Sequence, residues 1–384
     1  MLRFFNTAGP VNCNDHYCLP PLSRVNLAEV LALIDQKKYF VLHAPRQVGK
    51  TTYLLALTDY LNQAGKYHCL YVNLEMGQSA REDVRRGIQA VLNSMASMAR
   101  TLLADHFLKE HWADILAESG EDTALYEALT LWTEHSPKPL VLLLDEIDAL
   151  VGDTLISVLR QLRAGYPHRP ASFPQSVVLC GVRDVRDYRL HSNREKAVIT
   201  GGSAFNIKAK SLRLGDFSQA DVETLYQQHT AETGQSFQTP AMELVWKFTQ
   251  GQPWLVNALG YEVCFEMEVG RDRTVPITTE LVIEARERLI QRRETHLDQL
   301  VDKLKEARVQ RIISPMLQGE DLNQFVRQDD IQYVIDLGLV RHSDLGLQIA
   351  NPIYQEVILS STGLRIEVGP KRFLDGKKYT GDER

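Results

Sequence analysis

The stretch that most constrains this fold runs from residue 39 to residue 53 and reads YFVLHAPRQVGKTTY. Its first four residues are typical of a short buried strand, and residues 51–57 have the pattern of a helix start. Between them, residues 44–51 match the phosphate-binding pattern G-x-x-x-x-G-K-[ST], with Ala44 at the first glycine position. The alternative is a chance Gly-Lys-Thr-Thr in an ordinary strand–helix turn, and the flanking strand and helix disfavour it.

The residue types of this loop suit a bound phosphate. Backbone N–H groups and the start of the following helix attract the anion. Gly49 lets the backbone come close, Lys50 can reach the β and γ phosphates, and the Thr51 hydroxyl can ligate Mg²⁺. Alanine at position 44 fits if its φ stays negative. The predicted nucleotide-binding residues of the loop are Ala44, Pro45, Arg46, Gln47, Val48, Gly49, Lys50, Thr51 and Thr52.

A second motif follows at residues 139–148, which read PLVLLLDEID. An apolar strand that ends in two carboxylates is the Walker B pattern. In phosphate-loop enzymes the first acid, here Asp145, holds Mg²⁺. The next acid, Glu146, is placed to act as a general base on the attacking water. The alternative is a buried strand whose acids cap the next helix, and the preceding phosphate loop disfavours it.

Strands and helices alternate along residues 1–214. The patterns predict strands at 39–42, 67–74, 140–145, 175–180 and 208–214, with helices between them and a loop-rich lead over residues 1–24. Such alternation predicts an α/β fold, a P-loop NTPase parallel sheet with helices on both faces. The nucleotide should then lie at the carboxyl ends of the strands, where the phosphate loop and Asp145 both fall.

Arginine residues are candidates for stabilising the γ-phosphate. Arg183 follows the strand at 175–180, and we expect it either to contact the γ-phosphate as a catalytic residue or to pair with Asp184 or Asp187. Arg46, inside the loop, has a second candidate role, bracing the loop by pairing with an acid. Candidates for an arginine finger from a neighbouring subunit are Arg160, Arg163, Arg189 and Arg194.

Composition indicates which partners, which cellular location and which cysteine chemistry to expect. The formal net charge of −6 argues against a wholly basic nucleic-acid binder. We expect neither a membrane span nor a signal peptide, and a cytoplasmic location. Cys69 and Cys180, in apolar runs, fit reduced thiols in that compartment. Cys13, His16 and Cys18 are close in sequence, but no second Cys/His pair follows at zinc spacing, so zinc is disfavoured.

The pattern changes after residue 214. Residues 215–294 predict a helical lid that starts at a Ser218 cap and contains the turn Gly251-Gln252-Pro253. Residues 295–362 predict helices at 300–317 and 328–337 and a β-hairpin at 338–350, which together suggest a winged-helix-like C-terminal domain. Residues 363–384 read as a tail or linker.

The C-terminal domain bears on the choice of partner. Its helix before the hairpin carries Asp329, Asp330 and Asp336, which would repel DNA phosphates. We therefore favour a protein partner or self-association, with DNA binding weak and salt-sensitive. Basic residues that would supply it are Arg308, Arg311, Lys371, Arg372, Lys377 and Lys378.

Together the GKTT loop, the Asp145-Glu146 strand end and the Gly251-Gln252-Pro253 turn resemble the AAA-like ATPases of the archaeal-type and STAND-related P-loop group, over about residues 17–354. The resemblance implies an ASCE-type core, a helical lid and a winged helix. It implies the functional roles given above for Lys50, Thr51, Asp145 and Glu146. It also implies that Gly251 and Pro253 lie near the adenine. Some relatives continue into a nuclease-like domain. No such motif follows Tyr354, so we expect a shortened member.

The sequence therefore predicts an ATP-binding protein that uses Mg²⁺, hydrolyses ATP slowly and couples nucleotide state to domain movement. Two alternatives stay open. One is a nucleotide-gated regulator or DNA-binding adaptor with little turnover. The other is the ATPase motor of a DNA-processing or defence complex.

Overall fold

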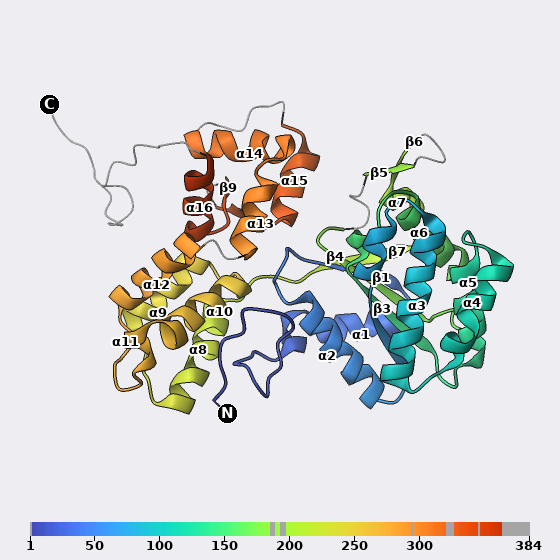
Figure 1. Ribbon diagram of the computed structural model, residues 1–384, viewed down its shortest axis with the longest axis horizontal. Helices are drawn as coiled ribbons and strands as arrows, with labels where there is room; N and C mark the ends of the chain where they lie inside the picture. The colour runs from blue at the N-terminus through green and yellow to red at the C-terminus, as the bar shows by residue number, and fades with distance from the viewer. Residues whose placement is uncertain are drawn as a thin grey trace.

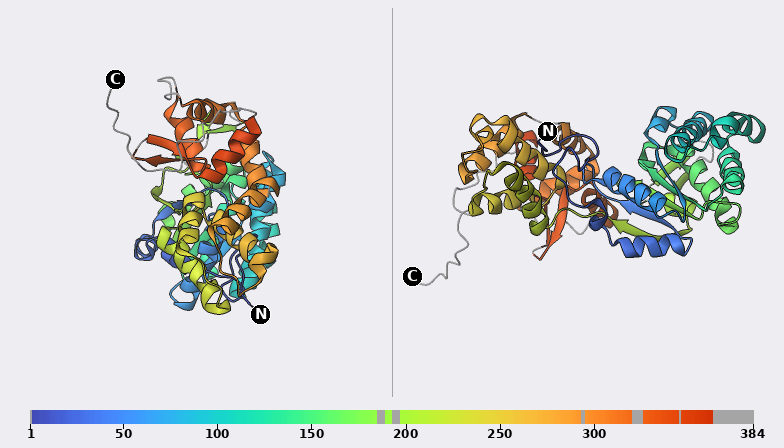
Figure 2. Two further views of the ribbon diagram at one scale, coloured as in Figure 1. Left: turned by 90° about the vertical axis from the view of Figure 1, so that its left-hand side faces the viewer. Right: turned by 90° about the horizontal axis from the view of Figure 1, so that it is seen from below.

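The computed structural model describes residues 2–362 except 185–188, 193–196, 293–294, 320–325 and 345. Figure 1 shows an α/β core on one side, a group of helices (α8–α12) beside it, and a C-terminal unit (α13–α16 with β8 and β9) above those helices. Seen from below, the core and the helical part form two lobes that meet near the middle of the molecule (Figure 2). The N-terminal segment lies against this junction.

A five-stranded sheet forms the centre of the core, as the sequence predicted. All paired neighbours run parallel. In spatial order the strands are β2 (His68–Asn73), β3 (Leu140–Asp145), β4 (Ser176–Gly181), β1 (Tyr39–His43) and β7 (Lys208–Arg213). The α/β fold class with a parallel sheet is therefore confirmed.

Strand residues alternate between two hydrophobic clusters, one on each face of the sheet. Phe40 and Leu42 belong to the cluster under α1 (Leu27–Asp35) and α2 (Lys50–Gln63). Tyr39 and Val41 belong to the cluster on the opposite face. Because both faces are buried, these strands read as continuous apolar runs. The helices of the second face are α3 (Val84–Leu103), α4 (Phe107–Ser119), α5 (Ala124–His135) and α6 (Gly152–Gly165).

The helical periodicity of the sequence from residue 80 to residue 108 extends beyond α3 at both ends. A 3₁₀ turn, Glu75–Ala80, precedes α3, and α3 ends where Ala104 adopts a left-handed φ of 53°. Asp105 then starts α4, because its carboxylate accepts hydrogen bonds from the Phe107 N–H at 2.9 Å and the Trp132 indole at 2.8 Å. Helix α4 was not predicted.

Two further elements were not predicted. They are a short antiparallel pair, β5 (Arg189–Ser192) with β6 (Ala197–Thr200), and the short helix α7 (Gly201–Ala204). The predicted partner Asp187 and the candidate finger Arg194 lie outside the described residues.

The helices of residues 215–292 are joined by loops, and an isolated bridge pairs Phe237 with Ile277; none of the named strands falls in this described range, as predicted. Ser218 caps α8 in a reciprocal capping box with Asp221, which confirms the predicted serine cap. None of the described helices has the length and hydropathy that a membrane span requires. In order, the helices are α8 (Gln219–Thr233), α9 (Thr239–Thr249), α10 (Pro253–Tyr261), a π-helical turn (Glu262–Glu266), α11 (Glu268–Arg271) and α12 (Thr279–Arg292).

The C-terminal unit contains the predicted helix at 328–337 and the predicted hairpin. The predicted helix at 300–317 is instead two helices, because turn hydrogen bonds at residues 304–306 separate them. The winged-helix arrangement itself stays a prediction. The elements are α13 (Thr295–Lys303), α14 (Ala307–Gln318), α15 (Gln328–Asp336), β8 (Val340–Ser343), β9 (Gly346–Ile349) and α16 (Pro352–Thr362).

The acidic helix of this unit differs from expectation. Asp336 is buried, Asp330 pairs with Arg311 at 2.9 Å, and Asp329 pairs with Arg327 at 3.3 Å. The predicted acidic face is therefore largely neutralised. The apolar side chains of the same helix pack on the core of the unit, as predicted.

One hydrophobic cluster spans the helical unit and the C-terminal unit. It includes Val245 of α9, Val282 of α12 and Ile353 of α16. Phe5 and Tyr17 belong to the same cluster, although the sequence assigned residues 1–24 to the α/β core. The Tyr17 hydroxyl lies 3.1 Å from Nδ1 of the buried His229. The two C-terminal units and the first residues of the chain thus share one core.

Gly251 packs closely against Phe217, in the segment between β7 and α8. Its φ is 78°, and its carbonyl accepts a hydrogen bond from the Phe217 N–H at 2.8 Å. A Cβ at this position would lie 2.0 Å from the Phe217 carbonyl oxygen. Gly234 has the same φ of 78° but no neighbouring atom within 4 Å of an added Cβ.

This pair gives a matched test. We expect Gly251→Ala to lower the free energy of unfolding by more than ~2 kcal/mol, because it adds a backbone clash to the left-handed strain. Gly234→Ala should cost only about 1 kcal/mol, from the strain alone. Urea unfolding of both variants measures the difference. An equal loss of unfolding free energy in the two variants would show that the close contact between Gly251 and Phe217 does not matter for stability.

Candidate functional site

A cavity of about 720 Å³ lies at the carboxyl ends of β1, β2 and β3. Residues 46–53 of the phosphate loop form one wall, and Glu146 lies at the end of β3. Asn6–Val11 of the N-terminal segment and Pro253 and Trp254 of α10 close the other sides. The sequence predicted the position of this site at the strand ends, but not the N-terminal wall.

The loop between β1 and α2 has the backbone that a phosphate loop needs. Gln47 and Gly49 adopt positive φ values of 57° and 98°, and Gly49 is the N-cap of α2. Ala44 is buried and its φ is not positive, which meets the condition set from the sequence. The Lys50 ammonium donates to the carbonyl oxygens of Ala44 at 3.1 Å and Pro45 at 3.0 Å. The lysine is therefore held inside the curve of the loop.

Asp145 connects the loop to the end of β3. Its carboxylate is fully buried and accepts a hydrogen bond from the Thr51 hydroxyl at 2.7 Å. The Tyr71 hydroxyl of β2 donates to the same oxygen at 3.1 Å. Burial and the Asp145 charge raise the pKa of Tyr71. Mg²⁺ prefers hard oxygen ligands of this kind, so Thr51 and Asp145 fit the metal role predicted for them.

Glu146 occupies an unusual backbone conformation for a non-glycine residue, with φ at 53°. Its own N–H donates to the Asp145 carboxylate at 2.9 Å. Burial raises the pKa of Glu146, and the nearby Lys50 charge opposes that shift. A half-buried carboxylate with a raised pKa in a cavity is a suitable proton acceptor. Asp148, by contrast, accepts a hydrogen bond from the Val182 N–H at 3.3 Å and lies outside this cavity.

The N-terminal segment bridges the core and α8–α10. The Val11 N–H donates to the Thr52 hydroxyl at 3.0 Å, and the Trp254 indole donates to the Thr7 carbonyl at 2.9 Å. The Cys18 backbone exchanges two hydrogen bonds with the Gln228 side chain. Cys13 and Cys18 form a disulfide rather than a metal site. These hydrogen bonds join residues between 41 and 247 positions apart, so no sequence pattern pointed to them.

Arg24 is a second residue that sequence reasoning missed. Its guanidinium donates to the Val48 carbonyl at 3.3 Å and to the Gly215 carbonyl, and lies 4.5 Å from the centre of the Phe217 ring. Burial lowers the pKa of Arg24 to about 10. Arg24 therefore joins the phosphate loop to the segment between β7 and α8.

The remaining predicted residues separate into two groups. Pro253 lines the cavity, whereas Gly251 packs against Phe217 and is not part of the cavity wall. Arg183 is not part of it either. Its guanidinium lies 5.0 Å from the Tyr333 ring centre, in a second cavity.

Two other arginine predictions can be placed. Arg46 was expected to pair with an acid, but its guanidinium donates to the Gln299 side chain at 3.4 Å. Arg163 donates to the Ser203 carbonyl at 3.0 Å on the surface of the core. Among the described residues that line the phosphate-loop cavity, the cations are Arg24, Arg46 and Lys50.

The chain is similar to one protein family and to several solved structures. A family profile described as an AAA-like domain matches residues 28–358. A Walker-type ATPase of Pyrococcus abyssi has a similar structure, with a TM-score of 0.56 and 12% identity, covering 92% of this chain and 99% of that one. The ORC2 protein of Aeropyrum pernix follows, with a TM-score of 0.48 and 15% identity over 90% of this chain and 96% of that one. No curated protein sequence matches this chain.

The position of Arg24 leads to a stability prediction. We expect Arg24→Gln to lower the free energy of unfolding by roughly 1.5–3 kcal/mol, because it removes charged hydrogen bonds to the Val48 and Gly215 carbonyls. Arg100→Gln, at an exposed position of α3, is the control and should change stability by less than about 0.5 kcal/mol. Thermal or urea unfolding measures both. An Arg24 variant as stable as the Arg100 control would show that the hydrogen bonds of Arg24 do not stabilise the fold.

Proposed function

Because this chain belongs to the AAA-like domain family of P-loop ATPases, we propose that it binds ATP with Mg²⁺ and hydrolyses it to ADP and phosphate. The observation that carries the proposal is the 2.7 Å hydrogen bond between Thr51 and Asp145 at the mouth of the phosphate loop. It brings together the two residues predicted to hold the metal, one from each motif. Glu146 follows directly, at the same end of β3.

Each residue has a defined role in this proposal. The loop N–H groups and Lys50 hold the β and γ phosphates, which requires the Lys50 ammonium to leave the carbonyls of Ala44 and Pro45. Thr51 and Asp145 would hold Mg²⁺, which when bound neutralises charge on the phosphates. The Glu146 carboxylate accepts a proton from the attacking water, and its raised pKa makes it a better base than an ordinary surface glutamate.

Contacts from the phosphate loop support a coupling between nucleotide state and domain position. Arg46 donates to Gln299 of α13, and Gly338 approaches Pro45 so closely that an added Cβ would lie 2.9 Å from the proline ring. The loop therefore touches both the nucleotide site and the C-terminal unit. A shift of the loop on ATP binding would press on this unit or release it.

A second candidate, a nucleotide-gated regulator with little turnover, is favoured by the position of Arg183. This arginine contacts Tyr333 of the C-terminal unit rather than the phosphate-loop cavity. Hydrolysis would be slow in this arrangement if Arg183 is the residue that must stabilise the γ-phosphate. Measuring the rate of phosphate release with and without DNA distinguishes the three candidate functions: an ATPase, a regulator with little turnover and a DNA-processing motor.

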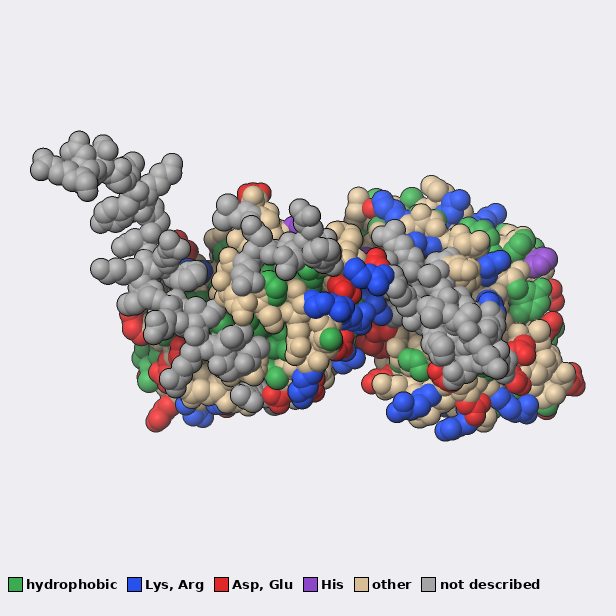
Figure 3. All heavy atoms as spheres, turned by 90° about the horizontal axis from the view of Figure 1, so that it is seen from above, with side chains coloured by type: hydrophobic (Ala, Val, Ile, Leu, Met, Phe, Trp, Pro, Cys, Tyr) green, Lys and Arg blue, Asp and Glu red, His purple; other side chains and the backbone are tan. Residues whose placement is uncertain are grey.

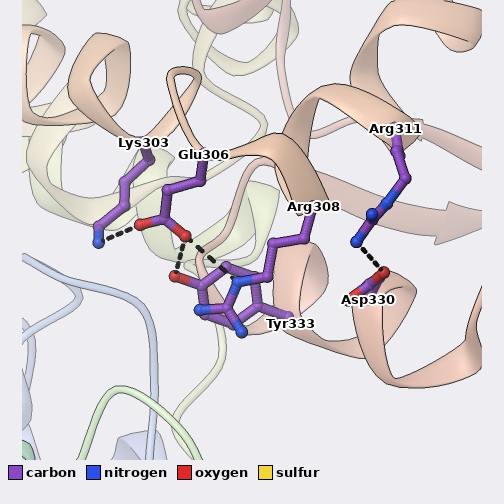
Figure 4. A network of polar contacts seen from close by, with 6 residues as sticks. All are labelled: Lys303, Glu306, Arg308, Arg311, Asp330 and Tyr333. Atoms are coloured by element: carbon purple, nitrogen blue, oxygen red, sulfur yellow. Dashed lines mark hydrogen bonds and ion pairs between the residues drawn. The ribbon is translucent and has the colours of Figure 1, made fainter.

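For partners, we propose protein contact or self-association ahead of DNA. Figure 4 shows that two of the basic residues expected to meet DNA have acidic neighbours within the unit: Arg308 lies 3.2 Å from Glu306, and Arg311 lies 2.9 Å from Asp330. The other four, Lys371, Arg372, Lys377 and Lys378, lie outside the described residues. Glu306 also binds Lys303 at 2.7 Å. These pairs reduce the charge available to DNA phosphates.

We also propose a cytoplasmic location. Three buried free thiols, Cys69, Cys180 and Cys264, favour it. The disulfide between Cys13 and Cys18 runs against it, because disulfides are rare in that compartment.

The first functional prediction concerns Lys50. We expect Lys50→Ala to weaken ATP binding by at least about a hundredfold, because the variant loses the buried cation placed for the β and γ phosphates. Lys66→Ala, which removes an exposed lysine paired with Asp35, is the control. Titration with fluorescent ATP measures both affinities. Unchanged ATP affinity in the Lys50 variant would contradict the assignment of residues 44–51 as a phosphate-binding loop.

The second concerns Glu146. Glu146→Gln should keep ATP affinity within a few-fold and lower turnover by roughly 10²–10⁴-fold, because the amide cannot accept a proton from water. Asp148→Asn is the matched comparison, since Asp148 lies outside the cavity and should be dispensable for turnover. Phosphate release under single-turnover conditions gives the rates. Undiminished release by the Glu146 variant would place the base elsewhere.

The third concerns DNA. The full chain should bind duplex DNA only weakly at about 150 mM salt, where the Debye length is ~8 Å. A fluorescence anisotropy isotherm at this salt measures the affinity. Binding tighter than about 1 μM would put the DNA-processing role first.

A further inference from the structure

A second cavity, of about 610 Å³, lies where the α/β core, the helical unit and the C-terminal unit meet. Gln252 of the helical unit and His296 and Asn351 of the C-terminal unit line it. The core contributes Arg183 and Arg213, at the ends of β4 and β7. Figure 3 shows Lys and Arg side chains gathered at the junction of the two lobes, seen from above. Of the residues considered above for phosphate or metal binding, Pro45 and Arg46 of the loop and the γ-phosphate candidate Arg183 line it.

Three buried side chains on this wall carry nitrogen atoms that have no hydrogen-bond partner among the residues the structure describes. The atoms are Gln252 Nε2, Asn351 Nδ2 and His296 Nδ1. Their residues are only 7%, 3% and 8% exposed. A buried polar group without a partner costs about 1–3 kcal/mol, and most such groups in folded proteins are satisfied. The NH₂ groups of Gln252 and Asn351 can only donate, so their position at one cavity indicates a ligand that accepts hydrogen bonds. Nδ1 of His296 donates or accepts according to the tautomer set by the contact of Nε2 with the Tyr354 hydroxyl.

Two of these side chains are also helix caps. The Gln252 carbonyl oxygen accepts from the Leu255 N–H at 2.6 Å and caps α10. The Asn351 carbonyl oxygen accepts from the Tyr354 N–H at 2.8 Å at the start of α16. Each oxygen is therefore committed to its helix, which leaves the NH₂ group as the free end. Both helix starts bring a partial positive charge to the cavity wall.

Charged side chains on the wall favour an anion. Of its carboxylates, Asp148 accepts a backbone N–H, and Asp302 pairs with Lys305 at 2.7 Å. Burial raises the pKa of Asp216, and the charges of the nearby Arg213 and Arg341 oppose that rise. Glu82 packs against Gly152. The cations of the wall are Arg46, Arg183, Arg213, Lys303 and Arg341.

We propose that this cavity binds a small phosphate-bearing molecule, such as a sugar phosphate or a mononucleotide. The arginines attract the phosphate, and the NH₂ groups of Gln252 and Asn351 donate to its oxygens or to those of the attached group. A cavity of this volume is in the range of small-molecule sites. Because all three units supply donors, the bound ligand would hold the C-terminal unit against the core. This site is separate from the proposed ATPase function and does not depend on it.

The test uses the full chain carrying Lys50→Ala, so that binding at the phosphate loop is suppressed. Inorganic phosphate, ribose 5-phosphate and AMP are titrated separately by calorimetry. We expect at least one of them to bind one-to-one, and the tightest of the three identifies the attached group. Asn351→Asp should then weaken that binding by at least about tenfold, because it replaces a donor by a charged oxygen at the ligand. The same substitution keeps the capping oxygen of α16, so the fold is retained.

Gln252→Glu makes the equivalent change at α10 and should weaken binding in the same way. The control is Arg327→Gln, an exposed arginine of the C-terminal unit that does not line the cavity. It should leave the affinity within about twofold. Two results would overturn the proposal: none of the three probes binding at roughly 10 mM, or a bound probe whose affinity Asn351→Asp leaves unchanged.

Discussion

The hydrogen bond between the Thr51 hydroxyl and the buried Asp145 carboxylate is the contact on which the site depends. It joins the start of α2 to the end of β3, two strands away from β1 in the sheet. A buried carboxylate needs such partners, because burying a charge without hydrogen bonds is costly. Tyr71 from β2 supplies the second one. The same oxygen thus gathers the ends of three elements, and the cavity opens beside it.

The parts of the fold that follow from local pattern were predictable. The five strands, the phosphate loop and the Walker B acids are each contained in a short run of sequence, so residue type and spacing suffice to find them. Helix boundaries were less predictable. Ala104 ends α3 in a left-handed conformation that nothing in its residue type announces.

The contributions from distant residues could not be found in this way. Arg24 reaches Gly215 across 191 positions, and Trp254 reaches Thr7 across 247. The prediction of an exposed acidic face on α15 was wrong for a related reason. Asp336 resembles a surface residue in sequence, yet tertiary packing buries it, and a count of charges on a helix does not reveal which side faces inward.

The core shared by the helical unit and the beginning of the chain has a consequence for how the protein forms. Phe5 and Tyr17 are synthesised long before the partners that enclose them, and the Tyr17–His229 contact spans 212 positions. Contacts of such high sequence separation form late, because the chain entropy of closing the loop must be overcome first. The intervening α/β core can complete its own sheet in the meantime. The opening residues therefore remain solvent-exposed for most of synthesis, and they are buried only when α8 and α10 arrive.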